Sequence, residues 1–513
     1  MINTSGYIIA GGISLSSLSM KVNKFKVAIP MIFGCACSSL CIAENIEFGK
    51  PNVIFVMADD IGYSDFGCYG ATKIETPHID QLAKKGIIFT QAHSPASTSS
   101  PSRYALLTGE YAWRKNIGVL PADAPLAVTS ETNTLAKLFK SNGYKTGMVG
   151  KWHLGLGSVE QAVDFNTSIE KGPNDIGFDY AYYFPATNDR VPCFYIENKM
   201  VDNYDPSDPI QISYKQKIGN DPTGKEFPEL LKLPFLHGHN GTIINGISRI
   251  GWMSGGNKAR WIDENMTELL TNKALAYIEN NQESPFFLYF ATHNAHEPRV
   301  VSEQFKGSSN AGLYGDIIQE FDHIIGLIIK KLKHLNLYDN TIIVVTSDNG
   351  PMIKEGYIDG ALENINGHNP YGVFRGQKYE LYEAGTRIPF IYSHPQSIKE
   401  PFNQTAPFCY IDMLATFSDI LKLHTNNLND SKSARVIFEN KNCTSYRDYV
   451  LTQNNSGNIA IRSNGWKYIP AYAGKDVELY NLINDPSELR NVAMAYPDIV
   501  KQMQQFVTKD KLQ

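Results

Sequence analysis

Hydroxyl groups and a single guanidinium cluster in the stretch STSSPSRYALLTG, residues 97–109, where an apolar, helix-like run begins. A serine before a proline often caps a helix, so a structural cap accounts for this stretch when it is taken alone. A helix N-terminus also attracts anions, through its free backbone N–H groups and its dipole. A serine at such a position could therefore act as a nucleophile toward a bound anion.

Polar residues also follow four short apolar runs, each with the length and the β-branched or aromatic content of a buried strand. The runs and the residues behind them are 53–57 with Asp59 and Asp60, GYKTGMVGKWHLG with Lys151 and His153, 286–290 with His293 and His296, and 342–345 with Asp348 and Asn349. A single acid after a strand is often only a turn former. Four strands that all end in acids, amides, lysines or histidines are better explained by a shared site.

Helix-like segments alternate with these strands, namely HIDQLAKKG, TNTLAKLFKSNG, TELLTNKALAYIENN and DIIQEFDHIIGLIIKKLKHLN. The alternation predicts an α/β fold with a large, mostly parallel central sheet flanked by helices. Beyond residue 440, the runs YVLTQ, NIAIRS, WKYIPAY and VELYNL predict short antiparallel strands. Asp485-Pro486 then predicts the start of one or two helices, so a smaller α+β subdomain should end the chain.

Oxygen ligands dominate the predicted shared site, because two strand ends supply Asp59, Asp60, Asp348 and Asn349. Crowded carboxylates repel one another unless a cation neutralises them. With no cysteine among the ligands, this set suits Ca²⁺ or Mg²⁺ better than Zn²⁺. Cations and proton carriers surround it, namely Arg103, Lys151, His153 and His293. A metal ion among several cations is typical of a site for a tetrahedral anion such as phosphate or sulfate.

Four motifs together resemble those of the type I sulfatases of the alkaline phosphatase superfamily. They are SSPSR followed by ALLTG, GKWHLG at 150–155, SDNG at 347–350 and FRGQKYELYEAGTRIPF at 374–390. The resemblance covers nearly the whole sequence after the N-terminal segment. It implies an alkaline phosphatase-like fold and an enzyme that hydrolyses sulfuric esters.

In the sulfatases, the first residue of the SSPSR-type signature is oxidised to formylglycine, so the resemblance implies that Ser99 is modified. A hydrated aldehyde can attack sulfur and then expel sulfate by collapsing back to the aldehyde, whereas a serine sulfate ester would need water to cleave it. The resemblance further implies that Asp59, Asp60, Asp348 and Asn349, with the modified Ser99, hold one Ca²⁺ ion, Mg²⁺ being less expected.

The remaining positions of the motifs receive roles by the same resemblance. It implies that Arg103 and Lys151 stabilise the aldehyde hydrate, that His153 is the base that removes its second proton, that Lys378 contacts the sulfate oxygens, and that His293 protonates the leaving alcohol. His296, in the same loop as His293, is expected to line the substrate or support the structure. Ser102 and Arg387 are expected to shape turns and packing.

One position departs from many members of the family, since Ser99 stands where they have cysteine. The resemblance implies that a serine of this kind is matured by a radical iron–sulfur enzyme, so that activity depends on a second protein. Two other functions remain open: a phosphatase or phosphodiesterase of the same superfamily that uses unmodified Ser99, and a glycan-binding protein that has lost catalysis.

Segments 174–207 and 221–262 interrupt the alternation of strands and helices, and they are rich in Asn, Asp, Gly, Pro, His and aromatic residues. Long insertions of this kind commonly carry specificity. Their candidates for binding sugar hydroxyls are Asp189, Arg190, His237 and His239. Similar exported sulfatases act on sulfated glycans, so we expect an exo-acting carbohydrate sulfatase. Galactose or N-acetylgalactosamine sulfate is favoured, and the sulfated position stays open.

Residues 1–43 read as a signal peptide, with lysines after Met20, which could be the true start, and an apolar stretch behind them. We therefore expect an exported protein with no stable membrane span. The periplasm is the favoured location, and a secreted form or a cell-surface lipoprotein is the alternative. The expected domains are a catalytic domain at 48–430 and a C-terminal subdomain at 440–513. A net charge of -5 argues against nucleic acid as a partner. The four cysteines outside the signal peptide (Cys68, Cys193, Cys409 and Cys443) could pair or simply pack.

Overall fold

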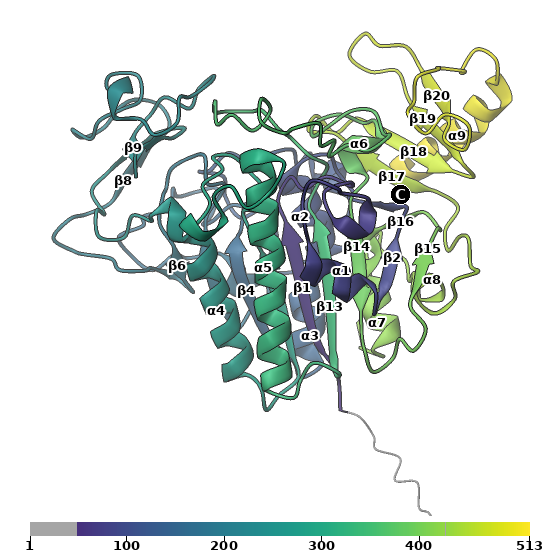
Figure 1. Ribbon diagram of the computed structural model, residues 1–513, viewed down its shortest axis with the longest axis horizontal. Helices are drawn as coiled ribbons and strands as arrows, with labels where there is room; N and C mark the ends of the chain where they lie inside the picture. The colour runs from purple at the N-terminus through teal and green to yellow at the C-terminus, as the bar shows by residue number, and fades with distance from the viewer. Residues whose placement is uncertain (1–48, 426, 513) are drawn as a thin grey trace, which may run out of the picture. The chain divides into compact units, whose positions relative to one another are not determined.

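The computed structural model describes residues 49–425 and 427–512, so the predicted signal peptide lies outside the described residues. The described chain packs as one compact unit around a ten-stranded sheet. Its strands lie in the order β15-β2-β14-β13-β1-β12-β4-β5-β6-β7 (Figure 1). The five strands from β13 to β5 run parallel to one another. The predicted α/β class with a mostly parallel central sheet is therefore confirmed.

Three strands at the centre of this sheet, β1, β12 and β13, are buried along their whole length. Helices on both faces shield them from water, which is why their sequences read as continuous apolar runs. In chain order the strands of the sheet are β1 (Asn52–Ala58), β2 (Ile87–Phe89), β4 (Lys145–Lys151), β5 (Tyr180–Phe184), β6 (Ile196–Glu197), β7 (Met200–Val201), β12 (Phe286–Ala291), β13 (Thr341–Ser347), β14 (Phe390–Ser393) and β15 (Phe402–Gln404).

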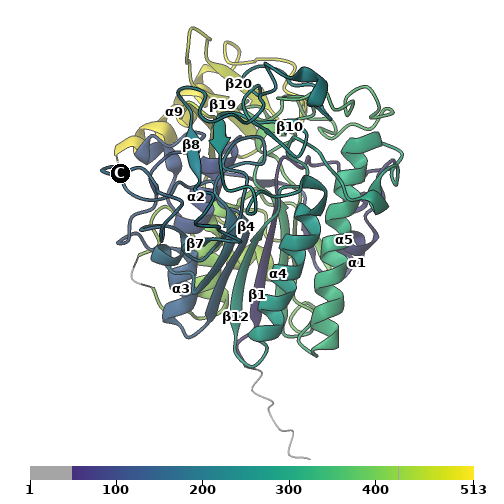
Figure 2. The same cartoon turned by 90° about the vertical axis from the view of Figure 1, so that its left-hand side faces the viewer.

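Helices cover the two faces of the sheet, with α1, α4 and α5 on one face and α3 and α7 on the other (Figures 1 and 2). The helices are α1 (Pro77–Ala83), α2 (Ser99–Thr108), α3 (Leu135–Ser141), α4 (Met266–Asn280), α5 (Gly312–His334), α6 (Glu383–Thr386), α7 (Met413–Ile420), α8 (Arg435–Glu439) and α9 (Pro497–Leu512). Each of the four segments predicted to be helical between the strands overlaps one of these helices, namely α1, α3, α4 and α5. Long α5 shows the reason most plainly, because its apolar residues recur at helical spacing and are buried.

The four strands predicted to end in polar residues are neighbours, in the order β13-β1-β12-β4. Because all four are parallel, their carboxyl ends lie at the same edge of the sheet. In the register, Ala58 of β1 pairs with Ser347 of β13, and Ala291 of β12 pairs with Gly150 of β4. The residues that follow these strands are thus brought together by the sheet itself.

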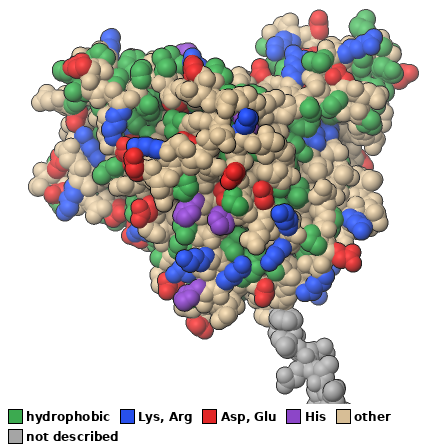
Figure 3. All heavy atoms as spheres, viewed as in Figure 1, with side chains coloured by type: hydrophobic (Ala, Val, Ile, Leu, Met, Phe, Trp, Pro, Cys, Tyr) green, Lys and Arg blue, Asp and Glu red, His purple; other side chains and the backbone are tan. Residues whose placement is uncertain are grey.

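Three short strand pairs lie outside the main sheet in the described chain. They are β3 (Ala92–His93) with β16 (Phe408–Cys409), β8 (Gln211–Ser213) with β11 (Trp252–Ser254), and β9 (Ile243–Ile244) with β10 (Ile247–Ser248). Strands β9, β10 and β11 belong to the insertion at 221–262, which the sequence marks as a specificity loop, whereas β8 lies between the two insertions. Among the described residues, no helix is long and apolar enough to cross a membrane, and the four described cysteines are free thiols. On the face shown in Figure 3, acidic and basic side chains are interspersed rather than gathered by sign.

A four-stranded antiparallel sheet follows near the C-terminus, as predicted, with strands β17 (Val450–Gln453), β18 (Ile459–Ser463), β19 (Trp466–Ile469) and β20 (Glu478–Asn481). One of the one or two helices predicted after these strands is present, but its predicted start at Asp485-Pro486 is wrong, because the last helix begins only at Pro497. The Asp485 carboxylate instead accepts hydrogen bonds from the backbone N–H groups of Leu489 and Arg490, which closes a turn. Glu488 within that turn has a φ of 51°, a left-handed conformation that cannot continue a helix.

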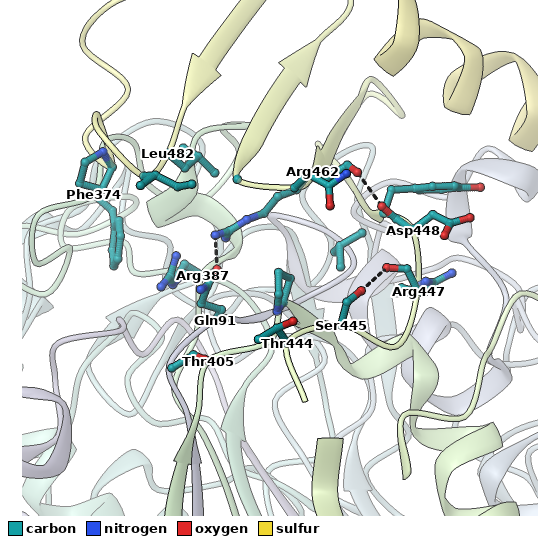
Figure 4. A pocket seen from close by; sticks show the side chains of 18 of the residues that line it. Gln91, Phe374, Arg387, Thr405, Thr444, Ser445, Arg447, Asp448, Arg462 and Leu482 are labelled. Carbon is teal, nitrogen blue, oxygen red and sulfur yellow. Dashed lines mark hydrogen bonds between the residues drawn. The ribbon is translucent and has the colours of Figure 1, made fainter. Parts of the chain in front are cut away.

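A groove of about 620 Å³ lies between the C-terminal sheet and the main domain (Figure 4). Gln91 and Arg387 line it from the main domain, and Arg462 reaches across from β18 to donate a hydrogen bond to Gln91. The predicted metal and catalytic residues are not among the described residues that line it. This groove is therefore an interface between two parts of the chain rather than the predicted site.

Candidate active site

Ser99 is the first residue of α2, and its hydroxyl lies buried at the edge where the parallel strands end. Its Oγ accepts a hydrogen bond from Lys151 Nζ at 3.2 Å. The same atom lies 3.4 Å from Asp59 Oδ1 and 3.5 Å from Asn349 Oδ1. One helix start and three strand ends thus converge on this hydroxyl, as the sequence predicts for a shared site.

The loop before α2 is fixed by contacts that place Ser99. Ser102 Oγ donates to the carbonyl of Ala96 at 2.8 Å and accepts from its N–H at 3.2 Å, which ties the loop to the first turn of the helix. The Ser97 N–H donates to the carbonyl of Gln453 on β17. The C-terminal sheet therefore helps to hold the backbone two residues before Ser99.

Two carboxylates, Asp348 and Asp59, meet a buried guanidinium. Arg103, one turn along α2 from Ser99, donates to Asp348 Oδ2 from Nε at 3.1 Å and from Nη2 at 2.7 Å, and its Nη2 lies 3.8 Å from Asp59 Oδ1. All three side chains have no exposed surface. Since unpaired charge is costly away from water, this pairing explains why the helix carries an arginine at this position.

The second aspartate, Asp60, turns back toward the site because its φ of 59° lies in the left-handed region. Its Oδ1 accepts from Asn349 Nδ2 at 2.7 Å, and its Oδ2 lies 2.8 Å from Lys378 Nζ. Burial, together with the neighbouring carboxylates, raises the pKa of Asp60 to about 7 despite the nearby lysine. A buried acid with such a pKa marks a place where more positive charge would be stabilising.

The donor set at this place fits a metal ion. Oxygen atoms of Asp59 and Asn349 lie next to Ser99 Oγ, and Asn349 donates a hydrogen bond to Asp60. Ligand atoms of Asp59, Asp60 and His296 all lie within 4.8 Å of one another. His296 was expected only to line the substrate or support the structure. The structure places its Nε2 3.9 Å from Asp60 Oδ2, at the edge of the candidate metal site.

Three histidines lie buried around these groups. His153 Nε2 contacts the carbonyl of Leu120 at 3.0 Å. Burial, with Lys151 nearby, lowers the pKa of His153 well below its usual value and that of His293 to about 4. The pKa of His296 is also well below its usual value, because of burial and then Lys378. All three are therefore neutral at neutral pH in the protein without bound anion.

Glu355, which sequence reasoning missed, contacts this site. Its Oε2 lies 2.8 Å from Lys378 Nζ and 3.9 Å from His296 Nε2. Burial alone would raise the pKa of Glu355, but the ammonium of Lys378 lowers it to about 2. Glu355 lies beyond the SDNG motif in the loop after β13, and no spacing in the sequence links it to Lys378. Only the fold reveals the contact.

The predicted sugar-binding residues separate into two groups. Asp189 Oδ2 lies 3.0 Å from His239 Nε2, and its Oδ1 accepts from Arg190 Nε at 3.2 Å, so these three form one cluster. Arg190 helps to lower the pKa of His153, and Asp189 acts in the opposite sense on the pKa of His296, so the charges of the cluster act on two histidines of the site. His237 is exposed on the loop two residues before His239 and does not take part in these contacts.

Comparison with known proteins agrees with this geometry. The sulfatase family model matches residues 51–423, and a model described as N-sulphoglucosamine sulphohydrolase, C-terminal, matches residues 371–513. An N-acetylgalactosamine-6-O-sulfatase of Bacteroides thetaiotaomicron is 46% identical over 479 residues, which cover 90% of this chain and 93% of the relative. Human steryl-sulfatase is 29% identical over 86% of this chain and 78% of its own length.

Among solved structures, one from a study of glycosaminoglycan metabolism by Bacteroides thetaiotaomicron superposes with a TM-score of 0.88 at 46% identity, over 90% of this chain and all of the other. Fold, sequence and the residues gathered around Ser99 thus agree. The chain belongs to the sulfatase family and is a sulfuric ester hydrolase.

Proposed function

We propose that this sulfatase removes the 6-O-sulfate from N-acetylgalactosamine at the end of a sulfated glycan. The observation that carries the proposal is the 46% identity to an N-acetylgalactosamine-6-O-sulfatase over nearly the full length of both chains. This identity narrows the choice of substrate, because the sequence patterns favoured galactose or N-acetylgalactosamine sulfate and left the sulfated position open.

Asp59, Asp60, Asp348 and Asn349, with Ser99, are the proposed ligands of one metal ion. A set built mainly of oxygen atoms favours Ca²⁺, with Mg²⁺ second. When bound, the ion would supply positive charge to the sulfate and to the nucleophile. We further propose that Ser99 is converted to formylglycine, which would supply a hydrated aldehyde as nucleophile.

The chain's own side chains would orient the ester and move its protons. Lys151 Nζ, 3.2 Å from Ser99 Oγ, holds the nucleophilic group in place. Lys378 Nζ lies 2.8 Å from Asp60 Oδ2, next to the proposed metal ligands, where it could contact sulfate oxygens. Neutral His153 is available as a base, and His293 must carry a proton to assist the departing sugar alcohol. A bound anion beside His293 would raise its pKa and favour that protonated state.

The cluster of Asp189, Arg190 and His239 is the proposed contact for the leaving sugar. Asp189 remains ionised, because Arg190 and the hydrogen bond from His239 outweigh the effect of burial and keep its pKa well below the usual value. An ionised carboxylate beside a guanidinium and an imidazole offers both acceptors and donors to sugar hydroxyls. Exposed His237 is a weaker member of the proposed sugar site.

Maturation and location complete the proposal. A serine-type signature requires a radical iron–sulfur maturing enzyme as partner, and the sequence of residues 1–43 supports export to the periplasm. Both are testable in the native host by fractionating the cells and analysing the tryptic peptide that contains Ser99 by mass spectrometry. Loss of a pair of hydrogens from Ser99, together with reactivity toward hydrazides, is expected in periplasmic material.

The activity itself is tested with matured protein and a panel of 6-sulfated N-acetylgalactosamine, its 4-sulfated isomer, and 6-sulfated galactose and N-acetylglucosamine. We expect the first to have the highest kcat/KM, and Ser99→Ala to lose at least about 1,000-fold in kcat. Faster cleavage of another sugar would overturn the substrate assignment alone. An active enzyme with intact Ser99 and two bound transition metals would favour the phosphatase branch instead.

A further inference from the structure

Glu355 lies beside the proposed anion site, on the loop after β13. Its carboxylate is 22% exposed and pairs with Lys378, whose side chain is 3% exposed. Tyr379 donates its hydroxyl to the other carboxylate oxygen, and His296 Nε2 lies 3.9 Å away. The negative charge of Glu355 thus lies next to the lysine proposed to contact sulfate, and Glu355 is not one of the proposed metal ligands or sugar contacts.

The backbone that carries Glu355 is held by a buried ionic cluster. The Glu297 carboxylate accepts hydrogen bonds from three successive N–H groups, those of residues 355–357, at distances from 2.6 to 3.2 Å. Arg299 pairs with Glu297 at 3.1 Å and with Asp359 at 2.7 Å. The side chains of Glu297, Arg299 and Asp359 are at most 3% exposed, and each is paired. The position of Glu355 is therefore built into the fold.

The formal charges of the site can be counted from its side chains. Three buried cations (Arg103, Lys151 and Lys378) balance three buried carboxylates (Asp59, Asp60 and Asp348). A divalent metal ion then leaves a net charge of about two positive units, and Glu355 reduces it to about one. Without a bound anion the nearby histidines are neutral, and Arg190 and Asp189 form an ion pair whose charges cancel. A proton taken up by His293 with the anion would add the same charge to the wild type and to Glu355→Gln, so the comparison between them keeps its sign.

Sulfate and phosphate differ in the charge that such a site must match. A sulfate monoester carries one negative charge, whereas inorganic sulfate and a phosphate monoester at neutral pH carry close to two. Removing one negative charge from the site strengthens the binding of a dianion by roughly the square of the factor that it gives a monoanion, because Coulomb energy scales with the product of the charges.

We propose that Glu355 is a specificity-determining residue that sets the net charge of the site for a monoanionic sulfate ester and against dianions. It would thereby favour release of inorganic sulfate and exclude phosphate monoesters. The inference rests on the proposed function only in placing the sulfate group beside Lys378. It does not depend on which sugar leaves.

The test measures binding rather than turnover. The full chain with unmodified Ser99, loaded with Ca²⁺, is titrated calorimetrically with methyl sulfate (a monoanion), inorganic sulfate and methyl phosphate, for the wild type, Glu355→Gln and Glu355→Asp. Glu363→Gln serves as the matched control, because it removes the same charge from an exposed position eight residues along the chain.

We expect Glu355→Gln to shift the preference for inorganic sulfate over methyl sulfate by about tenfold toward the dianion. Methyl phosphate should follow inorganic sulfate. Glu355→Asp and Glu363→Gln should leave the preference within about twofold of the wild type. An unchanged preference in Glu355→Gln, or weaker binding of all three anions, would overturn the proposal, the latter because Glu355 would then act only by holding Lys378 in place.

The wild-type chain provides a second test, which does not require any variant to fold. The cost of desolvating an ion grows with the square of its charge, whereas its attraction to the site grows only in proportion to the charge, so a site of low net charge favours the monoanion. The proposal therefore requires methyl sulfate to bind at least as tightly as inorganic sulfate, and tighter binding of the dianion would contradict it. None of these probes is a sugar. A wrong assignment of N-acetylgalactosamine would therefore appear in the saccharide panel and leave these titrations unaffected.

Discussion

The hydroxyl of Ser99, the proposed nucleophile, lies among charges that are buried and paired. Lys151 faces Asp59, Arg103 faces Asp348 and Lys378 faces Asp60. Such pairs contribute little to stability by themselves, because desolvation offsets most of their attraction. Their value here is electrostatic, since they hold oriented charges where a sulfate group and a metal ion would bind.

The proposed role of His293 as a general acid can be tested by comparing substrates with different leaving groups. As a general acid it would assist a sugar alcohol, which is a poor leaving group, far more than a nitrophenolate, which leaves without a proton. We expect His293→Ala to lose about 100- to 10,000-fold in kcat on the sugar sulfate and less than about tenfold on nitrophenyl sulfate. Steady-state kinetics with both substrates check this. Equal losses on both would show that His293 does not protonate the leaving group.

Asp60 makes the stability of the metal-free protein depend on pH. Its pKa is about 7 when folded and 3.8 in the reference state, so the folded chain binds the extra proton between these values. The stability that comes from this group is complete below about pH 4 and is lost as pH rises through 7. We expect the melting temperature after chelation to fall across this window relative to Asp60→Asn, in which the titration is absent. Parallel curves for both proteins would contradict the assignment.

Chelation at pH 7.5 should also lower the melting temperature of the wild-type chain and abolish its activity, and Ca²⁺ should restore both. The reason is the crowding of Asp59, Asp60 and Asp348, whose mutual repulsion a cation relieves. Differential scanning fluorimetry with and without Ca²⁺ measures the shift. An unchanged melting temperature in the presence of chelator would show that no metal ion supports these strand ends.

Among the elements, α2 ends at a glycine that is closely packed against its neighbours. Gly109 closes the helix with a φ of 67°, and a Cβ there would lie 2.8 Å from Leu414 of α7 and 3.0 Å from Ser431. The close approach lets the buried helix that carries Ser99 and Arg103 pack against α7. Any side chain at this position must therefore either strain the backbone or displace its neighbours.

We expect Gly109→Ala to destabilise the chain by about 1–3 kcal/mol, through strain at positive φ and overpacking together. The matched control is Gly70→Ala, since Gly70 also has positive φ, 105°, but nothing lies within 4 Å of its added Cβ. Chemical denaturation compares the two. If both variants lose the same stability, the packing of α2 against α7 does not require glycine.

At the scale of the whole molecule, a buried ionic network joins the C-terminal sheet to the main domain. Glu383 of α6 pairs with Arg387, with Arg462 of β18 and with Lys467 of β19, and Lys467 pairs in turn with Glu488. The two parts also share a backbone contact at Gln453, next to the loop that places Ser99. Separating them would leave these charges unpaired.

We therefore expect the described chain to unfold in a single thermal transition, and Glu383→Gln to lower stability by about 3–5 kcal/mol as buried cations lose their partner. Exposed Glu439→Gln, which removes the same charge from the surface, should change it by less than about 1 kcal/mol. Scanning calorimetry would show two separate transitions if the C-terminal sheet were an independent domain.

The sequence alone determined the fold class, the order of the main strands and helices, and most residues that surround Ser99. Buried parallel strands need continuous apolar runs, and residues behind parallel neighbours must meet at one edge, so a linear pattern is enough to find them. The family motifs carried the same information for Lys378, which lies far along the chain from the other members of the site.

Only the tertiary structure decided which distant groups meet. Glu355 pairs with Lys378. The Glu488 carboxylate pairs with Lys467 and accepts a hydrogen bond from the Glu383 N–H, and these contacts hold a turn where the residues at Asp485 predicted a helix. Likewise, the Asp189 carboxylate contacts His239 and not His237. These contacts join segments that are far apart along the chain or compete with a local preference, and their energy comes from pairing buried charge, which no short pattern of residues encodes.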